Sequence, residues 1–423
     1  MNIKAFSLFI FILLLIPVFG LGNVSATQGR VRVIIEVDNN FDPNSIVALG
    51  GRIVTRCIAL PIVIADLPLN TIDHIKKAKG VVHVDLDAEV HILKPSSHGG
   101  GKSKTQPQQT IPWGIERVHA PDAWAYTTGS SGGVIEVAVL DTGIDYDHPD
   151  LKDNIAWGVS TLNGRVSTKP NSYMDVNGHG THVAGIIAAL NNDIGVVGVA
   201  PGVEIYAIKV LGNGGIGRVS DIILGIDQAL LGPDGVLDSD GDNIIVGDPD
   251  DDAAEVISMS FGGSSDVNSL HDALIDAYNY GVVLVAAAGN EGASSPLYPA
   301  AYPEVIAVGA IDSNDTVPDW SNRGVEVSAP GVDILSTYPD DTYETLSGTS
   351  MACPHVSGVV ALIQAIHYTN HGTVLPVGES DDSSSGTVRG ILHKTAEDLG
   401  SDGWDPLYGY GVVNAYEAVQ AAS

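Results

Sequence analysis

The sequence has few basic residues. Lysine and arginine together number 20, against 51 aspartates and glutamates, which gives a formal net charge of −31 at pH 7. This charge excludes nucleic acid as a partner, because phosphate backbones are bound by basic surfaces. It also makes the folded chain repel itself, so we expect salt or bound cations to offset it.

Cysteine is equally scarce, with two residues, Cys57 and Cys353. In an exported protein two such thiols are able to form a disulfide. These two lie, however, in pieces of the chain that we expect to be separated by cleavage, as argued below. We therefore expect both to be small, buried, hydrophobic side chains instead.

No stretch beyond the N-terminus reads as long and apolar enough to span a bilayer. The N-terminus carries Lys4, an apolar run from Phe6 to Phe19, and then three small residues at 24–26. This pattern predicts a secretory signal peptide over residues 1–26. The alternative, a single membrane anchor, is disfavoured because no basic stop-transfer signal follows. We predict a secreted, extracellular protein with no membrane contact after signal removal.

The next part of the chain, residues 27–98, has the pattern of a small α+β unit. Apolar alternation predicts strands at 31–37, two within 52–67 and closing strands over 81–93, with helices at 42–49 and 70–80. The stretch that follows, KPSSHGGGKSKTQPQQT, has no apolar periodicity. Its composition is typical of a linker and of a site of proteolysis.

From about residue 99 to the end, short apolar runs alternate with longer helical ones. Continuous apolar strands that alternate with helices indicate an α/β fold, doubly wound, with a mostly parallel sheet covered on both faces. In such sheets ligands bind at the carboxyl ends of the strands. The residues just past those ends are therefore the candidates for chemistry.

The first candidate is Asp141, directly after the apolar run VIEVAVL. The sequence AVLDTG is also typical of aspartic proteases, which need two carboxylates that share a proton. A second Asp-Thr-Gly or Asp-Ser-Gly does not occur in the chain. The aspartic-protease interpretation is therefore disfavoured.

Two further candidates begin predicted helices. NGHGTHVAG contains His179 and His182, which suit either a metal or a general base, although no HExxH motif accompanies them. Ser350 in SGTSMACPHVSG is either an N-cap or a nucleophile at a helix N-terminus, where the backbone stabilises an oxyanion. Asn290 in AAAGNEG is either a turn residue or a side-chain donor to that oxyanion.

Together Asp141, His179 and Ser350 supply an orienting carboxylate, a base and a nucleophile, in the chain order of subtilisin. The stretches DTGIDYDHPDL, NGHGTHVAG, SMSFGG, AAAGNEG and SGTSMACPHVSG resemble the signatures of the subtilisin (subtilase) family. The resemblance extends from about Gln109 to the C-terminus. With its acidic stretch and N-terminal unit, the chain also resembles the calcium-rich subtilisins of hyperthermophilic archaea such as Thermococcus.

The resemblance implies a subtilisin-like fold and a serine endopeptidase. Ser350 would attack the scissile carbonyl, His179 would carry its proton, Asp141 would orient the imidazole, and His182 would be structural. Asn290 and the Ser350 N–H would bind the oxyanion. Peptide and protein substrates would lie as an extended strand, with broad specificity. The residues that would hold that strand are Gly215, Gly217, Ser260, Phe261 and Gly262.

The resemblance also implies that residues 27–98 are a ferredoxin-like propeptide, an intramolecular chaperone and inhibitor of residues 99–423. Its tail would lie in the cleft and be cut by Ser350 in cis. We expect the cut between Lys94 and Gly101, and favour the bond between His98 and Gly99.

The stretch DSDGDNIIVGDPDDD lies in an acidic insertion at 232–252. Asp238, Asp240, Asp242 and the carbonyl of Ile244 have the oxygen spacing of the first half of an EF-hand loop, and Asp248 is placed to close the shell. The alternatives are a solvated loop or disorder, which the apolar run 244–246 disfavours. We predict structural Ca2+ here, with further ligands from Asp234, Asp250, Asp251 and Asp252.

The family resemblance implies a second calcium site. Its side-chain ligands would be Gln109, Asp150 and Asn192, and its backbone ligands the carbonyls of Leu190, Ile194 and Val196. Asp145 and Asp147 are candidates for another ion. The resulting hypothesis is a secreted, calcium-dependent, monomeric serine endopeptidase. The rival hypothesis is an inactive subtilase fold that serves as a calcium-loaded binding module.

Overall fold

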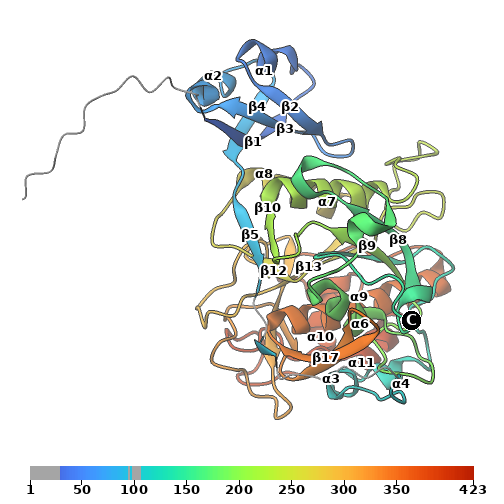
Figure 1. Cartoon of the computed structure of the whole chain (residues 1–423). Coiled ribbons are helices and arrows are strands. Elements are labelled where there is room, and N and C mark those ends of the chain that lie inside the picture. Colours follow the sequence, from blue (N-terminus) through green and yellow to red (C-terminus); the bar gives the residue numbers. More distant parts are fainter. Residues whose placement is uncertain (1–28, 94–95, 98–105) are drawn as a thin grey trace, which may run out of the picture.

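The computed structural model describes residues 29–93, 96–97 and 106–423. The predicted signal peptide lies outside these residues. The described chain forms a small N-terminal unit that sits on one face of a much larger unit, as Figure 1 shows.

The larger unit is built on one sheet of seven strands, in the order β15-β14-β13-β11-β7-β9-β8. Every pairing in this sheet is parallel. The strand sequences are nearly continuous apolar runs because both faces are covered, which confirms the predicted fold class. The strands are β7 (Glu136–Asp141), β8 (Ile155–Ser160), β9 (Glu204–Lys209), β11 (Val256–Met259), β13 (Val283–Ala287), β14 (Val305–Ile311) and β15 (Val327–Pro330).

Helices cover the two faces of this sheet. Val137 and Val139 of β7 face one hydrophobic cluster with α6 (His179–Ala188) and α9 (Thr349–His371). Their neighbours Ala138 and Leu140 face a second cluster with α7 (Val219–Leu231) and α8 (Asn268–Asn279). This alternation follows from the two-residue period of a strand.

Short elements complete the larger unit. Two of its small strands flank the cleft described below, and two others form a hairpin before α9. These elements are α3 (Trp113–Arg117), α4 (Ala120–Ala123), α5 (Pro170–Tyr173), α10 (Val388–Thr395), α11 (Ala415–Ala422), β10 (Ile216–Arg218), β12 (Phe261–Gly262), β16 (Ile334–Tyr338), β17 (Thr342–Ser347) and the 3-10 turns Lys152–Asn154 and Leu162–Gly164.

The N-terminal unit has the order β1-α1-β2-β3-α2-β4 and an antiparallel sheet in the order β2-β3-β1-β4. This is the βαββαβ arrangement of ferredoxin-like units. The helix expected over 70–80 is much shorter than predicted. Only Ile75 is buried in it, so little apolar burial supports further turns. The elements are β1 (Arg30–Val37), α1 (Asn44–Ala48), β2 (Arg52–Arg56), β3 (Ile62–Pro68), a 3-10 turn (Leu69–Thr71), α2 (Ile72–Ile75) and β4 (Val81–Leu86).

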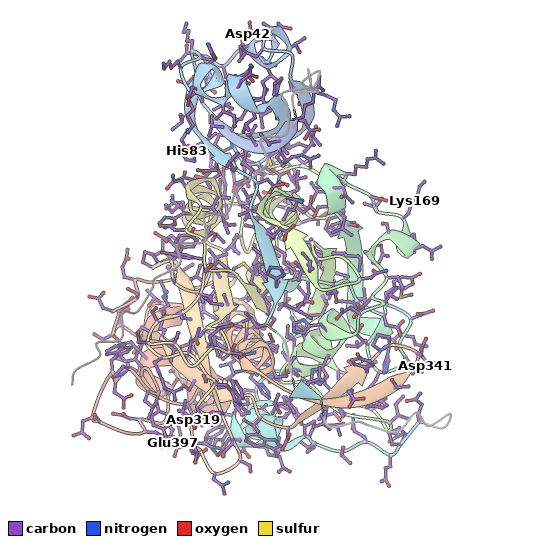
Figure 2. All side chains as sticks on the ribbon, turned by 60° about the vertical axis from the view of Figure 1, so that its left-hand side comes forward. Asp42, His83, Lys169, Asp319, Asp341 and Glu397 are labelled. Carbon is purple, nitrogen blue, oxygen red and sulfur yellow. The ribbon has the colours of Figure 1, made fainter. Side chains whose placement is uncertain are left out.

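The sheet of this unit uses both of its faces. One face packs on α1 and α2. The other, through Ile34, Ile62 and Ile64, joins the hydrophobic cluster of α7 and α8 in the larger unit. Figure 2 shows Asp42 at the far end of the small unit and His83 near the boundary with the larger one.

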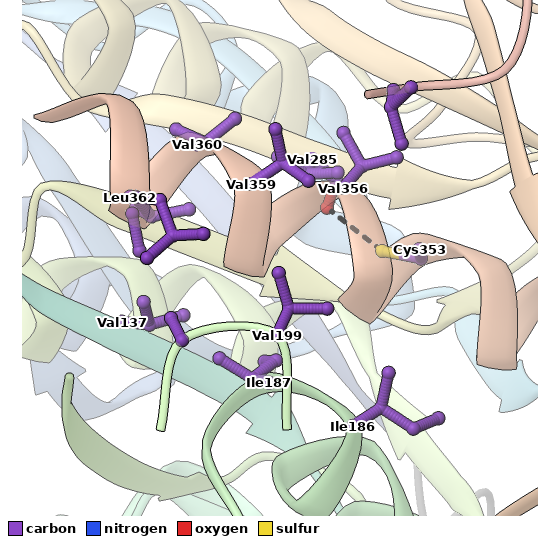
Figure 3. Packing of buried hydrophobic residues seen from close by; sticks show 14 of the residues in the cluster. Val137, Ile186, Ile187, Val199, Val285, Cys353, Val356, Val359, Val360 and Leu362 are labelled. Atoms are coloured by element: carbon purple, nitrogen blue, oxygen red, sulfur yellow. Dashed lines mark hydrogen bonds between the residues drawn. The ribbon is translucent and has the colours of Figure 1, made fainter. Parts of the chain in front are cut away.

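The helix α9 is the core of the larger unit. By length and composition alone this helix is long and apolar enough to cross a bilayer, which corrects the expectation that no such segment follows the N-terminus. Its most apolar stretch is wholly buried inside the larger unit. Figure 3 shows Cys353 on α9, among valines and leucines, with its Sγ 3.6 Å from the Val285 carbonyl. Cys57 and Cys353 are both buried and not paired in a disulfide, as predicted.

Candidate active site

Asp141 and His179 form a buried pair. Asp141 is the last residue of β7, and His179 is the first residue of α6. The imidazole Nδ1 lies 2.8 Å from Oδ1 of Asp141 and 3.0 Å from its Oδ2. This contact fixes Nδ1 as the protonated nitrogen, which leaves Nε2 as the basic one. Nε2 is buried and has no hydrogen-bond partner among the described residues.

Ser350 is the second residue of α9, which packs against α6. Its hydroxyl donates to the carbonyl of Ser260 at 3.0 Å and to the carbonyl of Leu93 at 3.3 Å. The second contact joins Ser350 Oγ to the carbonyl oxygen and so places the nucleophile beside the Leu93 peptide group. The nucleophile is therefore directed toward a peptide group of the same chain rather than toward the histidine.

Asn290 follows β13 and reaches the start of α9. Its Oδ1 accepts hydrogen bonds from the backbone N–H and the hydroxyl of Thr349, both at 2.9 Å. These two donors fix the orientation of the amide, so Nδ2 points away from Thr349. A Cβ placed on Gly348 would lie 3.1 Å from that Nδ2 and 3.7 Å from the Ser350 nitrogen. The two donors predicted for the oxyanion thus lie beside each other.

The predicted substrate-binding residues hold a strand of the N-terminal part. After β4 the chain leaves its own sheet as β5 (Glu89–Ile92), which lies antiparallel between β10 and β12. The Ile92 N–H donates to the carbonyl of Gly215 at 2.9 Å. The registered pairs are Gly217 with Val90, Phe261 with Ile92, and Gly262 with His91.

The chain continues past Ser350 on the other side. Ser96–Ser97 form β6, which pairs antiparallel with β17, the strand that leads directly into α9. Leu93 itself is buried, and its Cδ2 lies 3.3 Å from the position of a Cβ on Gly262. The described backbone on both sides of Ser350 is therefore extended and paired, as β-augmentation requires.

Asp175 is a buried residue of the site that the sequence analysis missed. It accepts hydrogen bonds from the Thr142 hydroxyl, from the Gly178 N–H and from both the N–H and the hydroxyl of Thr181. Thr142 in turn follows Asp141 and accepts from the Gly180 N–H at 3.0 Å. Asp175 thus locks the first turn of α6 to the end of β7. Its signal in the sequence is an aspartate four residues before His179.

His182, expected to be structural, is fully buried. Its Nε2 lies 3.1 Å from the carbonyls of Ile334 and Glu344. Burial, with a smaller contribution from His179, lowers the pKa of His182 to about 3. A neutral imidazole that donates to two carbonyls suits packing.

The acidic insertion brings three predicted ligands together. Carboxylate oxygens of Asp238, Asp240 and Asp242 lie within 4.8 Å of one another. Their hydrogen bonds come from the backbone of their own turn: Asp238 accepts from the Gly241 N–H at 2.6 Å, and Asp242 from the Ile244 N–H at 2.7 Å. Oxygen ligands in this spacing fit Ca2+.

Asp248 does not join this group among the described residues. It accepts a hydrogen bond from the Asp250 N–H at 2.9 Å and lines a cavity of about 300 Å3 next to Val374. Asp251 accepts from the Ser239 N–H at 2.7 Å, while its buried Oδ2 has no partner in the part of the chain described. Asp252 accepts from the Asp234 N–H at 3.2 Å. Ile245 and Val246 are buried and anchor the insertion. Their burial argues against a disordered loop, the alternative that the apolar run disfavours.

The side chains predicted for the second calcium site lie close together. Gln109 Nε2 donates to the Leu190 carbonyl at 2.7 Å and to the Val196 carbonyl at 3.1 Å. Asp150 accepts from the Asn192 amide at 2.9 Å and from the Val196 N–H at 3.0 Å, and the Ile194 N–H donates to Asn192 at 2.8 Å. Burial raises the pKa of Asp150 to about 6. A buried carboxylate near the backbone carbonyls of Leu190 and Val196 supplies oxygen atoms of the kind that a hard cation takes.

A third acidic group surrounds a cavity of about 510 Å3, lined among others by Asp145, Asp147, Asp340 and Asp341. Burial and the neighbouring Asp147 raise the pKa of Asp145 to about 7. The two aspartates from the loop after β7 thus meet two from the turn between β16 and β17.

An Asp-His pair, a serine at a helix N-terminus and a side-chain amide, all at the carboxyl ends of parallel strands, define a serine hydrolase. A model of the subtilase family matches residues 132–411. The chain is 44% identical to "Subtilisin BL" of Lederbergia lenta over 74% of this chain and 100% of that protein. It is 40% identical to an "Alkaline protease" of Alkalihalobacillus alcalophilus, over 85% and 80% respectively.

A third relative, "Subtilisin E" of Bacillus subtilis, is 37% identical over 88% of this chain and 84% of that protein. The chain belongs to the subtilase family, and is a subtilisin-type serine endopeptidase. These relatives are bacterial, so the expected closest relationship with archaeal enzymes has no support from them.

Proposed function

We infer that the chain is a secreted, calcium-dependent endopeptidase that is made as a precursor and matures by cutting itself. The observation that carries this proposal is the carbonyl of Leu93, 3.3 Å from the Ser350 hydroxyl, at the end of a strand held in the cleft. This peptide bond has the position of a substrate.

In the proposed reaction Ser350 Oγ bonds to the Leu93 carbonyl carbon, and its proton passes to Nε2 of His179. Asn290 Nδ2 and the Ser350 N–H stabilise the oxyanion that forms. The bond to the following nitrogen breaks as His179 returns the proton to it. Water then hydrolyses the acyl-enzyme with His179 again as the base.

The cut that this geometry supports follows Leu93. The bond between His98 and Gly99, favoured from the sequence, lies outside the described residues. We therefore move the proposed boundary of the propeptide from residue 98 to residue 93. The backbone pairing of β5 with β10 and β12 agrees with broad specificity, and the buried side chains of Leu93 and Val90 add apolar contacts.

Polar contacts support an inhibitory role for the N-terminal unit. Asp85 accepts from the N–H and hydroxyl of Ser269 at the start of α8, each at 2.8 Å. Asp87 does the same for Ser220 in the first turn of α7, at 2.9 and 2.8 Å. Buried Asp227 accepts backbone N–H groups of the loop 58–60. Carboxylates at helix N-termini are favourable, so Asp85 and Asp87 cap α8 and α7 of the larger unit, and Asp227 in return binds a loop of the N-terminal unit.

Calcium is proposed at two places. The residues that would hold it are Gln109, Asp150, Asn192 and three carbonyls at one site, and Asp238, Asp240 and Asp242 at the other. Bound cations would offset the self-repulsion of a chain with net charge −31. Calcium would act on folding and stability, and the chemistry would remain with Ser350. We further propose a monomer that acts on protein and peptide substrates.

The test is to refold the purified chain and its Ser350→Ala variant with excess Ca2+ and to determine the new N-terminus by mass spectrometry. The parent chain should be cut after Leu93 and should hydrolyse peptides, and the variant should remain intact. Processing of the variant at the same rate would remove Ser350 as the nucleophile. A folded, calcium-bound but inactive parent chain would instead support the rival binding module.

A further inference from the structure

A group of metal-ligand side chains lies across the boundary between the N-terminal unit and the larger unit. Glu36 comes from β1, His83 from β4 and Asp272 from α8. One ligand atom of each lies within 4.8 Å of the others. Figure 2 shows His83 where the small unit meets the helices beneath it.

The contacts in this group are close but are not hydrogen bonds. His83 Nδ1 lies 3.0 Å from Glu36 Oε2, and His83 Nε2 lies 3.2 Å from Asp272 Oδ2. Yet Glu36 Oε2 and His83 Nε2 are buried atoms with no hydrogen-bond partner among the described residues. Buried polar atoms that lie near charged groups without forming a hydrogen bond are poorly satisfied, and a cation among them would satisfy both.

The charge around the group points to a cation. His83 Nε2 also lies 3.5 Å from Asp85, so three carboxylates surround one imidazole. Asp85 already accepts from Ser269 and keeps lone pairs for a further ligand contact.

We propose that Glu36, His83 and Asp272 bind a divalent transition-metal ion that bridges the two units. One imidazole and two carboxylates are ligands of Zn2+, whose bonds of about 2.0–2.2 Å are within reach of these atoms after small side-chain rotations. The imidazole separates this site from the calcium sites, because Ca2+ takes oxygen ligands. Asp85 is the nearest candidate for a fourth ligand.

A bridging ion would hold the two units together. An ion that binds only the joined state stabilises that state by mass action. This consequence rests on the proposed function, in which the N-terminal unit is a propeptide that must leave. Binding of the ion itself does not depend on that role. The metal would therefore slow the release of the propeptide after the cut.

The test of binding uses the full-length Ser350→Ala chain in excess Ca2+, titrated with Zn2+ by calorimetry and with Co2+ by visible absorption. We expect one Zn2+ per chain that is bound at least about tenfold more weakly after either His83→Gln or Asp272→Asn, since each removes one ligand. His74→Gln is the matched control, because His74 is an exposed histidine of the same unit. It should bind like the parent.

Equal Zn2+ affinity in the parent and in His83→Gln would overturn the proposal, as would the absence of Co2+ absorption from a bound imidazole. The slower release of the propeptide is tested in chains that keep Ser350. Zn2+ should lower the rate at which peptidase activity appears in the parent and in His74→Gln, but not in His83→Gln. An equal rate in all three would overturn the bridging role. Cleavage of the Ser350→Ala chain would contradict the proposed function instead, and leaves the titration intact.

Discussion

The active site and the acidic insertion both concentrate aspartates, and they hold them in opposite ways. Asp141 and Asp175 are buried, and their oxygens accept hydrogen bonds from His179, from Thr142 and from the first turn of α6. Asp238, Asp240 and Asp242 lie on a largely exposed turn and accept from the backbone of that turn itself.

This difference in hydrogen bonding distinguishes the aspartates that serve catalysis from those that serve stability. Charges satisfied by fixed protein dipoles are preorganised, and they need no ion to reach their geometry. Three carboxylates within a few ångströms repel one another unless a cation joins them. The same residue type therefore serves orientation in one region and ion binding in the other. The predictions below test this separation.

The largest effect is expected from the catalytic pair. His179→Ala should lower kcat/KM by at least about 10³, because the base is lost. Its unfolding temperature in Ca2+ should remain close to that of the equally unprocessed Ser350→Ala chain. His182→Gln is the contrast, because a buried imidazole that contacts two carbonyls is replaced. It should lower stability more than activity. Peptide hydrolysis measures the activity, and calorimetry measures the stability. A His179→Ala chain of near-parental activity would refute the assignment of His179 as the base.

The next effect concerns Asn290. Asn290→Ala should reduce kcat by about 10²–10³, the loss that removal of one such donor causes in a subtilisin. Asn290→Asp keeps an acceptor for the two Thr349 donors but loses the amide donor. It should lose a comparable factor in kcat, with little change in KM. Full activity of Asn290→Asp would show that Asn290 serves only to hold Thr349.

A smaller effect is expected from the insertion, and on stability alone. The combined change of Asp238, Asp240 and Asp242 to asparagine should lower the number of bound calcium ions by at least one. At a Ca2+ concentration of 100 times Kd, it should also lower the free energy of unfolding by about 3 kcal/mol, because the bound ion no longer stabilises the folded state. Calcium titration followed by thermal unfolding measures this loss, while kcat of the folded fraction should be unchanged. A large fall in kcat at saturating Ca2+ would show that the insertion also serves catalysis, and would contradict the proposed separation of roles.

The smallest effect depends on pH. Burial, followed by the charge of Glu255, raises the pKa of Glu136 to about 10, and burial raises that of Glu255 to about 7. The folded state therefore binds these protons more tightly than the unfolded state. The stability that these protons contribute is then full below pH 4.5 and falls as the pH rises, through about 7 for Glu255 and through about 10 for Glu136. Glu136→Gln should raise the unfolding temperature by a few degrees at pH 9 and little at pH 5; the opposite order would contradict it.

Much of the fold could be predicted from the sequence because the patterns that indicate it lie within short stretches of the chain. The apolar runs 134–140 and 282–288 contain most of the central strands β7 and β13, and α6 and α9 begin at His179 and Thr349, where the motifs predict helix starts. What escaped prediction depends on neighbours distant in sequence. The run 81–93 alternates uniformly, yet β4 joins the small sheet and β5 leaves it for the cleft. A strand pattern predicts pairing but not the partner.

The sequence by itself determined the class of fold, the family and the set of residues able to do the chemistry, because strand periodicity and short motifs are properties of neighbouring residues. The tertiary structure decided which peptide bond faces Ser350, that Asp175 locks α6 to β7, that Asp248 stands apart from its expected group, and that Glu36, His83 and Asp272 converge. Most of these contacts join residues tens to hundreds of positions apart, and only tertiary packing, within the larger unit or between the two units, brings such residues together.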